Sequence, residues 1–201
     1  MIHDVLLAFL ISYLIGAIPF ALIFTKLLAK KNPGQEGSGN YGALNSYEIT
    51  GKKTIGLLVF IFDCLKGLLA VYLVYEFFSF QSLYIIISAI SVVLGHSFNI
   101  FLKFRGGRGL STSLGAVLFF NPFVALVWGI VWYLFYRIVR RDVIFSNIWS
   151  LLITPTVIIF APTHIINFFN YNVSILVTDY KIFSIIICLI MLSAHFRKGV
   201  S

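Results

Sequence analysis

Long apolar runs divide the chain, and short stretches rich in charged residues, glycine and proline separate one run from the next. A helix that crosses the hydrocarbon core of a bilayer needs about 20 predominantly apolar residues. In lipid, backbone N–H and C=O groups must bond within the segment, and a helix allows this. The pattern therefore predicts about seven transmembrane helices. The predicted spans cover residues 5–28, 55–78, 82–102, 111–120, 122–139, 146–161 and 173–193.

Residues 111–120 form the shortest of these runs, and Asn121 and Pro122 follow directly. Proline lacks a backbone N–H and clashes with the preceding turn of a helix, so these two residues predict a tight turn between helices near a membrane surface. The count falls to about five or six if short segments merge or lie flat in the interface.

Composition supports the same fold class. The chain has 201 residues, of which 60% are apolar and 11% are charged, whereas soluble domains average about 45–50% apolar and about 25% charged residues. We predict an all-α polytopic membrane protein with a single membrane-embedded domain over residues 1–201 and short loops. Cys64 and Cys188 lie alone within apolar runs, without metal-ligand spacing or a disulfide framework, and are predicted to be packing residues.

The charges predict the orientation in the membrane. A formal charge of +8 suggests a nucleic acid partner in a soluble protein, but here the cations cluster between spans, so we expect none. With seven spans, one side receives Lys26, Lys30, Lys31, Lys52, Lys53, Lys103, Arg105, Arg108, Arg137, Arg140, Arg141, Arg197 and Lys198. The other side receives Asp4, Glu76, Asp179 and Lys181. The positive-inside rule places the basic loops and the C-terminus in the cytoplasm and the N-terminus outside.

Two inter-span segments on the basic side combine glycine with polar residues. Residues 32–53 read NPGQEGSGNYGALNSYEITGKK, in which glycines alternate with Ser and Asn. Such a backbone can approach a ligand closely while small side chains bond to it. The alternative is a flexible polar loop.

The second segment, residues 101–112, reads FLKFRGGRGLST and leads into the run that begins near Ser111. Glycines before a helix N-terminus can present N–H groups to an anion, and guanidinium groups add bidentate phosphate contacts. The alternative is attraction of the cations to anionic lipid headgroups.

These motifs resemble those of the bacterial acyl-phosphate:glycerol-3-phosphate acyltransferases of the PlsY type. That family carries approximately GSGN-x-GATN-x-x-R and GH-x-(F/Y)-P-x-(F/Y)-x-x-F-K-G-G-K-G. The chain has GSGNYGALN and, over residues 95–109, GHSFNIFLKFRGGRG. Between them lies an F-x-D-x-x-K-G segment formed by Phe62, Asp63, Lys66 and Gly67. The resemblance covers nearly the whole chain.

The resemblance implies a seven-helix enzyme of phospholipid synthesis in the bacterial cell membrane, with its active site facing the cytoplasm. It would transfer a fatty acyl group from acyl phosphate to the 1-hydroxyl of glycerol 3-phosphate, giving lysophosphatidic acid and phosphate. The expected partners are these two substrates and membrane lipid, and no cofactor or metal is expected. The oligomeric state is left open. We further hypothesise that the phosphate of the donor takes the hydroxyl proton.

The resemblance also assigns the site. The implied catalytic residues are Ser38, Asn40, Asn45, His96 and His195. The implied phosphate-binding residues are Gly37, Gly39, Arg105, Gly106, Gly107, Arg108 and Gly109. Asp63 and Lys66, one helical turn apart within a span, are expected to pair or to line a polar cleft and to support the site.

Several positions depart from the family pattern. Glu48 stands where the family has arginine, Leu44 where it has threonine and Asn99 where it has proline. A family S-L-A-S pattern corresponds to residues 144–147, IFSN, and a C-terminal R-H-R-E-N pattern matches only at His195. The H-x-x-N spacing of residues 164–167 is predicted to lie on the opposite side, away from the site.

These departures leave two alternatives to acyl transfer. The first is a catalytically impaired homologue that binds an anionic lipid or acyl phosphate as a regulatory or partner protein. The second is a transporter of an anionic lipid, which is less favoured because the polar groups gather on one side instead of forming a path across the bilayer.

Overall fold

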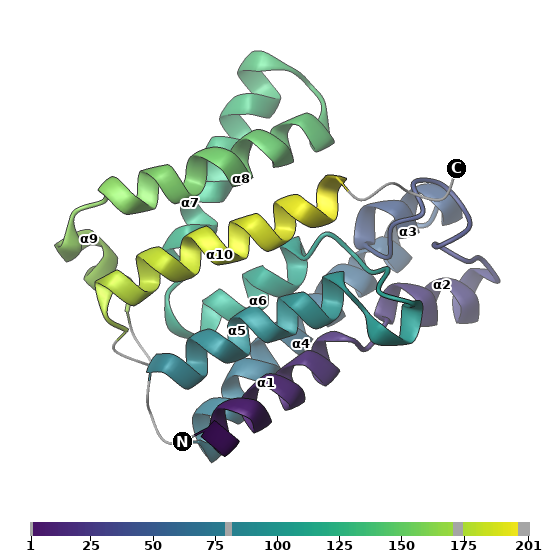
Figure 1. Ribbon diagram of the computed structural model, residues 1–201. Helices are drawn as coiled ribbons and strands as arrows, with labels where there is room; N and C mark the ends of the chain where they lie inside the picture. The colour runs from purple at the N-terminus through teal and green to yellow at the C-terminus, as the bar shows by residue number, and fades with distance from the viewer. Residues whose placement is uncertain (1, 79–81, 171–174, 197–201) are drawn as a thin grey trace.

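Helices account for most of the part of the chain that the structure describes. The computed structural model describes residues 2–78, 82–170 and 175–196 (Figure 1). Its elements are α1 (Ile2–Gly16), α2 (Phe20–Ala29), α3 (Ala43–Thr50), α4 (Lys53–Phe77), α5 (Ser82–Ser97), the 3-10 helix η1 (Ile100–Leu102), α6 (Leu110–Phe120), α7 (Phe123–Leu134), the π-helix η2 (Phe135–Val139), α8 (Val143–Phe160), α9 (Thr163–Phe168) and α10 (Val177–Phe196). Arg197, Lys198 and residues 173–174 of the last predicted span lie outside the described residues.

Five helical segments are long and apolar enough to cross a membrane. They are Ile2–Ala29, Lys53–Phe77, Ser82–Leu102, Val143–Phe160 and Val177–Phe196. Two shorter apolar helices, Leu110–Phe120 and Phe123–Val139, lie between the third and fourth of these. Each predicted apolar run thus contains a helix, and the sharp turn predicted at Asn121 and Pro122 separates α6 from α7.

The first apolar run was predicted to form one helix over residues 5–28, but it forms two, α1 and α2. It is interrupted between α1 and α2, where Pro19 provides no backbone N–H for a continuous helix. Side chains from elsewhere satisfy the carbonyls at the break. The amide of Asn99 donates to Ala17 O at 2.6 Å, and Lys66 Nζ donates to Ile18 O at 2.9 Å.

The segment 32–53 also differs from a fully irregular loop, because residues 43–50 form α3. Gly51 ends this helix in the left-handed conformation, with φ of 67°, and its N–H donates to Tyr47 O. Asn45 and Ser46, polar residues that a solvated loop would leave exposed, are buried in α3. The helix was not predicted because its apolar residues have no helical periodicity.

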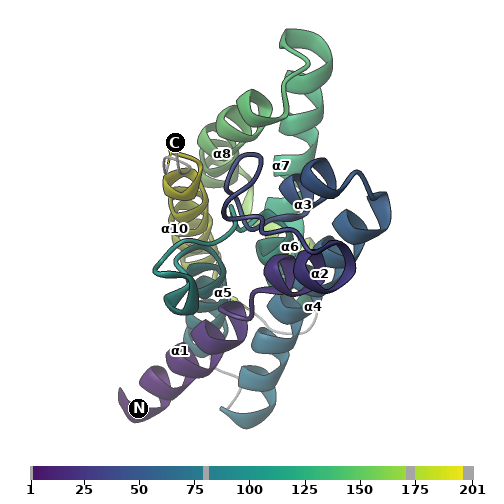
Figure 2. The same ribbon diagram turned by 90° about the vertical axis from the view of Figure 1, so that its right-hand side faces the viewer.

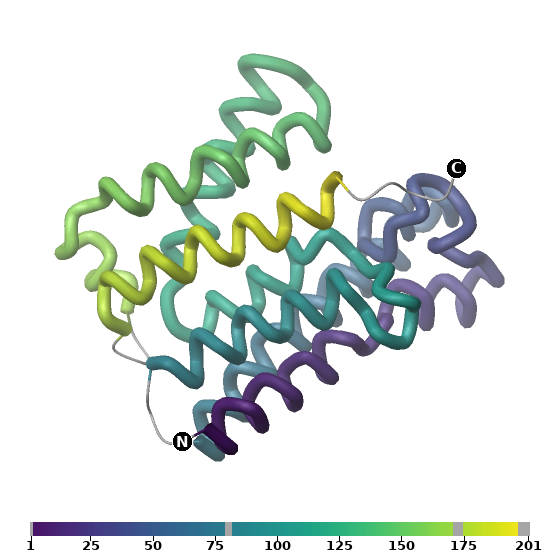
Figure 3. The backbone as a smooth tube through the Cα atoms, viewed as in Figure 1, coloured from purple at the N-terminus to yellow at the C-terminus, as the bar shows by residue number. Residues whose placement is uncertain are grey.

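The helices run between two ends of the molecule (Figure 1). One end, which we call the loop end, holds α2, α3, the start of α6 and the last turn of α10, together with residues 30–42 and 98–109 (Figures 1 and 2). The opposite end holds the start of α1, α9 and the turn between α6 and α7. The backbone tube in Figure 3 shows the chain passing repeatedly from one end to the other.

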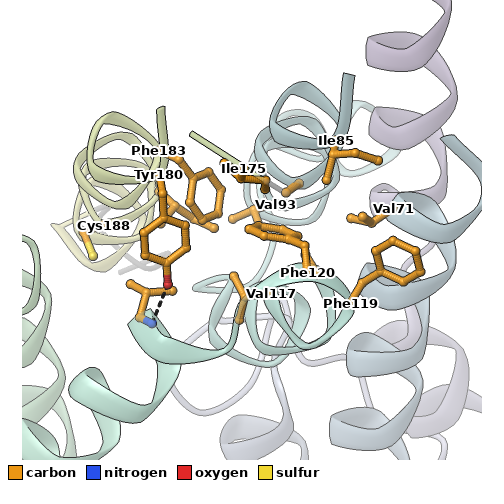
Figure 4. Close-up of a cluster of buried hydrophobic side chains, with 14 of the residues drawn as sticks. Val71, Ile85, Val93, Val117, Phe119, Phe120, Ile175, Tyr180, Phe183 and Cys188 are labelled. Carbon is orange, nitrogen blue, oxygen red and sulfur yellow. Dashed lines mark hydrogen bonds between the residues drawn. The ribbon is translucent and has the colours of Figure 1, made fainter. Parts of the chain in front are cut away.

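The hydrophobic core lies among α4, α5, α6 and α10, and close to the opposite end it is aromatic (Figure 4). The ring of Phe120 packs edge-on against Phe183, with centroids 5.4 Å apart. The hydroxyl of Tyr180 accepts from Val124 N at 2.7 Å and donates to Asn121 O at 3.3 Å. Because these bonds satisfy backbone groups at the start of α7, they fix the α6–α7 turn in the apolar interior.

Close contact between α4 and α6 positions the polar residues of α4. A methyl group on Gly67 would overlap Thr112 O, and one on Gly115 would overlap Cys64 O. Small residues at such contacts let helix backbones approach in a membrane. The start of α6, with the glycine-rich segment before it, is therefore held close to Asp63.

Candidate functional site

The two glycine-rich segments predicted from the sequence meet at the loop end (Figure 2). We call residues 30–42 the first glycine loop and residues 98–109 the second glycine loop. Tyr41 N donates to Gly106 O at 3.5 Å, which joins the two loops directly. Their meeting brings the two family-like motifs into one site, although they lie far apart in the sequence.

Asn45 organises the first glycine loop from its place in α3. Its Oδ1 accepts from Ser38 N at 2.9 Å. Its Nδ2 lies within hydrogen-bonding distance of the carbonyl oxygens of Pro33 and Asn40, at 2.9 Å each, and of Glu36 O at 3.3 Å. One buried amide thus ties together four backbone positions, and the positive φ of Gly37 and Gly39, 62° and 69°, lets the loop fold around it.

An ion pair closes the outer edge of the first glycine loop. Lys31 Nζ lies 2.6 Å from Glu36 Oε2, and Glu36 Oε1 accepts from Asn32 N at 3.2 Å. The hydrogen bond from Lys31, followed by that from Asn32, holds the pKa of the Glu36 carboxyl below its ordinary value. Glu36 therefore remains ionised at neutral pH and keeps the ends of this turn together.

The second glycine loop is built against His96. Gly107 N donates to His96 O at 3.2 Å. A methyl group on Gly106 would overlap His96 O, and one on Gly107 would overlap Nε2 of the imidazole. Only glycine fits at either position, so the loop backbone lies flat on this histidine. Lys103 and Phe104, with φ of 54° and 60°, turn the chain into the loop.

Arg108 and Arg105 take different places in the second glycine loop. Arg108 is partly buried, and removal of its guanidinium from water lowers the pKa, while the nearby carboxylate of Glu48 opposes that shift. Arg105 is exposed and lies near Tyr41. Burial raises the pKa of the Tyr41 hydroxyl, and the charge of Arg105 counters this. Glu48, the departure from the family pattern, is thus close enough for its charge to act on Arg108.

A cavity of about 620 Å³ begins at these loops and extends among the helices. The polar residues that line it are Asn40, Asp63, His96, Arg108, Ser111, Ser113 and Asn147. The apolar residues that line it include Val117, Val124, Trp128, Trp132, Ile187 and Met191. The cavity therefore joins a polar part, which carries the arginine and the histidine, to an apolar part formed by α6, α7 and α10.

The predicted site residues fall into two groups. Asn40, His96, Arg108 and Gly109 line the cavity. Ser38, Asn45, His195, Gly37, Gly39, Arg105, Gly106 and Gly107 are not among its lining residues. Ser38 is exposed on the first glycine loop, and His195 Nδ1 lies 2.8 Å from Met191 O, close enough to Arg108 to be affected by its charge.

The structure also locates the other residues that the sequence analysis discussed. His164 and Asn167 lie in α9 at the opposite end, as predicted (Figure 1). Asp63 and Lys66 form the expected pair, with Lys66 Nζ 2.7 Å from Asp63 Oδ1. Asn147, in the segment that departs from the family pattern, lines the cavity.

Three contributions to the site were missed. His96 Nδ1 lies 3.5 Å from Asp63 Oδ1, which joins the predicted pair to a residue from another helix. Trp128 and Trp132 line the cavity and stack on one another, but two tryptophans four residues apart in an apolar run carry no signal beyond packing. Within residues 2–78, 82–170 and 175–196, no group of three or more His, Cys, Asp or Glu side chains is placed to hold a metal ion.

Comparison with known proteins finds similarity in both sequence and fold. The model of the family described as glycerol-3-phosphate acyltransferase matches residues 6–199. A protein of that name from Wolbachia pipientis wMel is 40% identical over 149 residues, which cover 74% of each chain. Another from Pelagibacter ubique is 38% identical over 169 residues, covering 84% of this chain and 82% of the relative.

Two crystal structures are also similar to this chain. Both are of PlsY (YgiH), an integral membrane glycerol 3-phosphate acyltransferase. The glycerol 3-phosphate form matches with a TM-score of 0.75 and 27% identity, over 95% of this chain and 88% of that one. The lysophosphatidic acid form matches with a TM-score of 0.73.

Proposed function

The chain belongs to the glycerol-3-phosphate acyltransferase family, and on this premise we propose that it transfers a fatty acyl group from acyl phosphate to glycerol 3-phosphate. The 1-hydroxyl oxygen of the acceptor forms a bond with the acyl carbonyl carbon, and the bond from that carbon to the phosphate oxygen breaks. The products are lysophosphatidic acid and inorganic phosphate. The hydroxyl proton passes to the departing phosphate.

The cavity is the observation that carries the proposal. An acyl phosphate is an apolar chain that ends in a dianionic head, and the cavity has an apolar part continuous with a polar part that contains Arg108. The apolar part suits the chain, because burial of each methylene is worth about 0.8 kcal/mol. The guanidinium of Arg108 and the start of α6 after Gly109 suit the phosphate.

Each loop residue has a role in this proposal. Asn40 and His96, which line the cavity, contact the reacting groups. Ser38, exposed on the first glycine loop, binds the acceptor from the water side. Asn45 holds that loop through its backbone contacts. His195, in the last turn of α10, lies close enough to Arg108 to be affected by its charge and borders the proposed phosphate site.

The glycines and the second arginine complete the proposed phosphate sites. Gly37 and Gly39 give the first glycine loop its left-handed turns, and Gly106 and Gly107 let the second glycine loop pass close to His96. Arg105 adds charge at the exposed rim of the site. Since acyl phosphate already carries an activated leaving group, holding two anions in line and stabilising developing charge is the main task of these groups.

We also propose the arrangement in the membrane. The helix run Ile2–Ala29, the four other long helices and the two shorter ones each cross the bilayer once, as a single domain over residues 1–201. The basic residues of α2, both glycine loops and η2 support an orientation with the loop end in the cytoplasm of a bacterial cell and α1 beginning outside. The active site then meets water-soluble glycerol 3-phosphate, while the acyl chain stays at membrane depth.

Turnover by the purified protein tests the function. The protein in lipid nanodiscs is incubated with palmitoyl phosphate and glycerol 3-phosphate, and lysophosphatidic acid and phosphate are measured together. We expect equal amounts of both, a large loss with Ser38→Ala, and no loss with Ser193→Ala, which removes an exposed hydroxyl from α10. Phosphate release without lysophosphatidic acid would contradict the transfer reaction, and an unaffected Ser38→Ala variant would contradict the site.

A further inference from the structure

A buried cluster of three titratable side chains lies at the polar part of the cavity, and two of its members, Asp63 and His96, line that part. The side chains of Asp63, Lys66 and His96 are 2%, 3% and 6% exposed. Lys66 Nζ and His96 Nδ1 both approach Asp63 Oδ1, at 2.7 Å and 3.5 Å. Asp63 and Lys66 belong to α4 and His96 to α5, so the cluster joins two transmembrane helices.

Charge balance alone does not account for this arrangement. Ionisable residues at membrane depth are costly and tend to mark functional sites. The ammonium group of Lys66 already neutralises the Asp63 carboxylate, and it also donates to Ile18 O at 2.9 Å. The contact between Asp63 and His96 is thus additional to a pair that is already balanced.

The other side of the imidazole supports the second glycine loop. The ring places Nε2 where any side chain on Gly107 would overlap it, and the backbone oxygen of His96 accepts from Gly107 N. His96 also lines the cavity with Arg108. A rotation of this ring would therefore move both the wall of the cavity and the support of the loop.

We propose that Asp63 is a positioning residue that fixes the orientation and the tautomer of His96 at the polar part of the cavity. Its carboxylate accepts the hydrogen of Nδ1, which leaves Nε2 of the neutral ring as an acceptor on the side of Gly107. The hydrogen bond at one imidazole nitrogen sets the state of the other, as carboxylates do for histidines in metal and hydrolase sites. Lys66 balances the carboxylate and ties it to the break between α1 and α2.

The proposal rests on the proposed function, since it assigns to Asp63 an effect on acyl transfer through His96. A positioning role and a purely structural ion pair predict different turnover for the variant that lacks both charges. If Asp63 only neutralises Lys66, removal of both charges together restores the enzyme. If Asp63 positions His96, removal of both charges restores the fold and leaves turnover impaired.

The test compares Asp63→Asn, Lys66→Gln and the double variant Asp63→Asn/Lys66→Gln with wild type in nanodiscs. We expect both single variants to lose thermal stability, since each leaves a buried charge without its partner. The double variant should regain the thermal midpoint but keep a kcat that is lower by about tenfold or more, the range found when supporting partners of active-site histidines are removed. His96→Gln should lower kcat by a smaller factor in this double variant than in wild type, because part of the contribution of His96 is already lost.

Ser88→Ala is the matched control. It removes a buried interhelical hydrogen bond, 2.7 Å from Ser12 Oγ, on the same helix as His96. We expect unchanged kcat and KM in this variant. A double variant of Asp63 and Lys66 with kcat and KM within about twofold of wild type, the size of ordinary surface substitutions, would overturn the proposal.

A measurement independent of turnover separates this proposal from the proposed function. In ¹⁵N-histidine NMR of the wild-type protein, the His96 signal is assigned by its loss in His96→Gln. We expect a neutral ring protonated at Nδ1, and a change of tautomer or ring environment in the double variant. A ring protonated at Nε2 alone overturns the proposal even if the enzyme is active, and an inactive wild type with the expected tautomer overturns only the proposed reaction.

Discussion

Asn45 Oδ1 accepts a hydrogen bond from Ser38 N at 2.9 Å, which fixes the exposed serine of the first glycine loop to a buried residue of α3. We predict that Asn45→Asp lowers kcat/KM by about tenfold or more, because a carboxylate still accepts from Ser38 but leaves buried carbonyls unpaired at about 1–3 kcal/mol each. Steady-state kinetics with glycerol 3-phosphate as the varied substrate measure this loss.

Asn170→Asp is the control for the Asn45 variant. Asn170 also takes part in a cluster of amides, since Asn121 Nδ2 lies 2.7 Å from its Oδ1, but it lies at the opposite end. This change should leave kcat/KM for both substrates unaltered. Equal losses from the two variants would mean that Asn45 acts through general stability and not through the first glycine loop.

The contact between Gly107 and His96 gives a second prediction. Gly107→Ala places a methyl group on Nε2 of the imidazole, so the second glycine loop must move, and we expect loss of turnover together with a lower thermal midpoint. Gly107→Ala/His96→Ala removes the ring, but the new Cβ would still lie 2.9 Å from Tyr41 O, so we expect only part of the thermal midpoint to be recovered and turnover not to be recovered. Thermal unfolding followed by tryptophan fluorescence, beside kinetics, separates the two effects.

Gly129→Ala serves as the control for this steric argument. A Cβ at Gly129 meets nothing within 4 Å, so the change should raise helix stability by about 0.5–1 kcal/mol and leave turnover intact. If Gly107→Ala behaved in the same way, the close approach of the second glycine loop to His96 would be wrong.

The apolar runs and the two glycine motifs could be predicted because their signals are local. Twenty apolar residues in a row define a helix in lipid whatever they contact. Glycines next to arginines before the start of α6 likewise indicate an anion site without reference to the rest of the chain. In the structure these two motifs meet, with Tyr41 N bonded to Gly106 O, while the anion site itself stays a prediction.

Contacts between helices were the part that could not be predicted. Pro19 is a local signal for the break in the first apolar run, but the side chains that satisfy the carbonyls there, Lys66 and Asn99, lie far from Pro19 in the sequence. For the same reason the spacing of Asp63 and Lys66 predicted their pair, while the contact of Asp63 with His96, from another helix, gave no sequence signal.

Replacement of Glu48 is predicted to strengthen the binding of glycerol 3-phosphate. Glu48 is exposed, and its carboxylate lies near Arg108, where it weakens the attraction of that arginine for phosphate. Glu48→Arg changes the local charge by two units, and we expect KM for glycerol 3-phosphate to fall by about twofold to fivefold at low salt, since exposed charge pairs are worth up to about 1 kcal/mol. The effect should shrink as ionic strength is raised.

Glu76→Arg is the matched charge control, because Glu76 is exposed near the end of α4 that lies away from the glycine loops. It changes the net charge equally and should leave KM unaltered. A fall in KM with both variants would indicate a general effect of net charge, and a rise with Glu48→Arg would show that the carboxylate itself helps to bind the acceptor.

The Lys31–Glu36 ion pair predicts how the first glycine loop responds to acid. Because its pKa is lowered in the folded protein, Glu36 stabilises the loop at pH values above the ordinary carboxyl pKa of 4.5, and this contribution is lost as pH falls through the lower folded value. Hydrogen exchange in residues 32–39 should be faster in Glu36→Gln than in wild type at pH 7. The two proteins should converge in acid, and a difference that grows as pH falls would contradict this sign.

The apolar part of the cavity predicts the choice of acyl chain. Gly129 lines the cavity with open space beside it, so Gly129→Phe fills room that a long chain would occupy. Each displaced methylene forfeits about 0.8 kcal/mol, or about fourfold in kcat/KM, so long acyl phosphates should lose far more than short ones.

Ile130→Phe, on the exposed side of α7, should preserve the wild-type preference. Competition between octanoyl and palmitoyl phosphate in one reaction measures the ratio directly, and an unchanged ratio in Gly129→Phe would mean that the chain lies elsewhere.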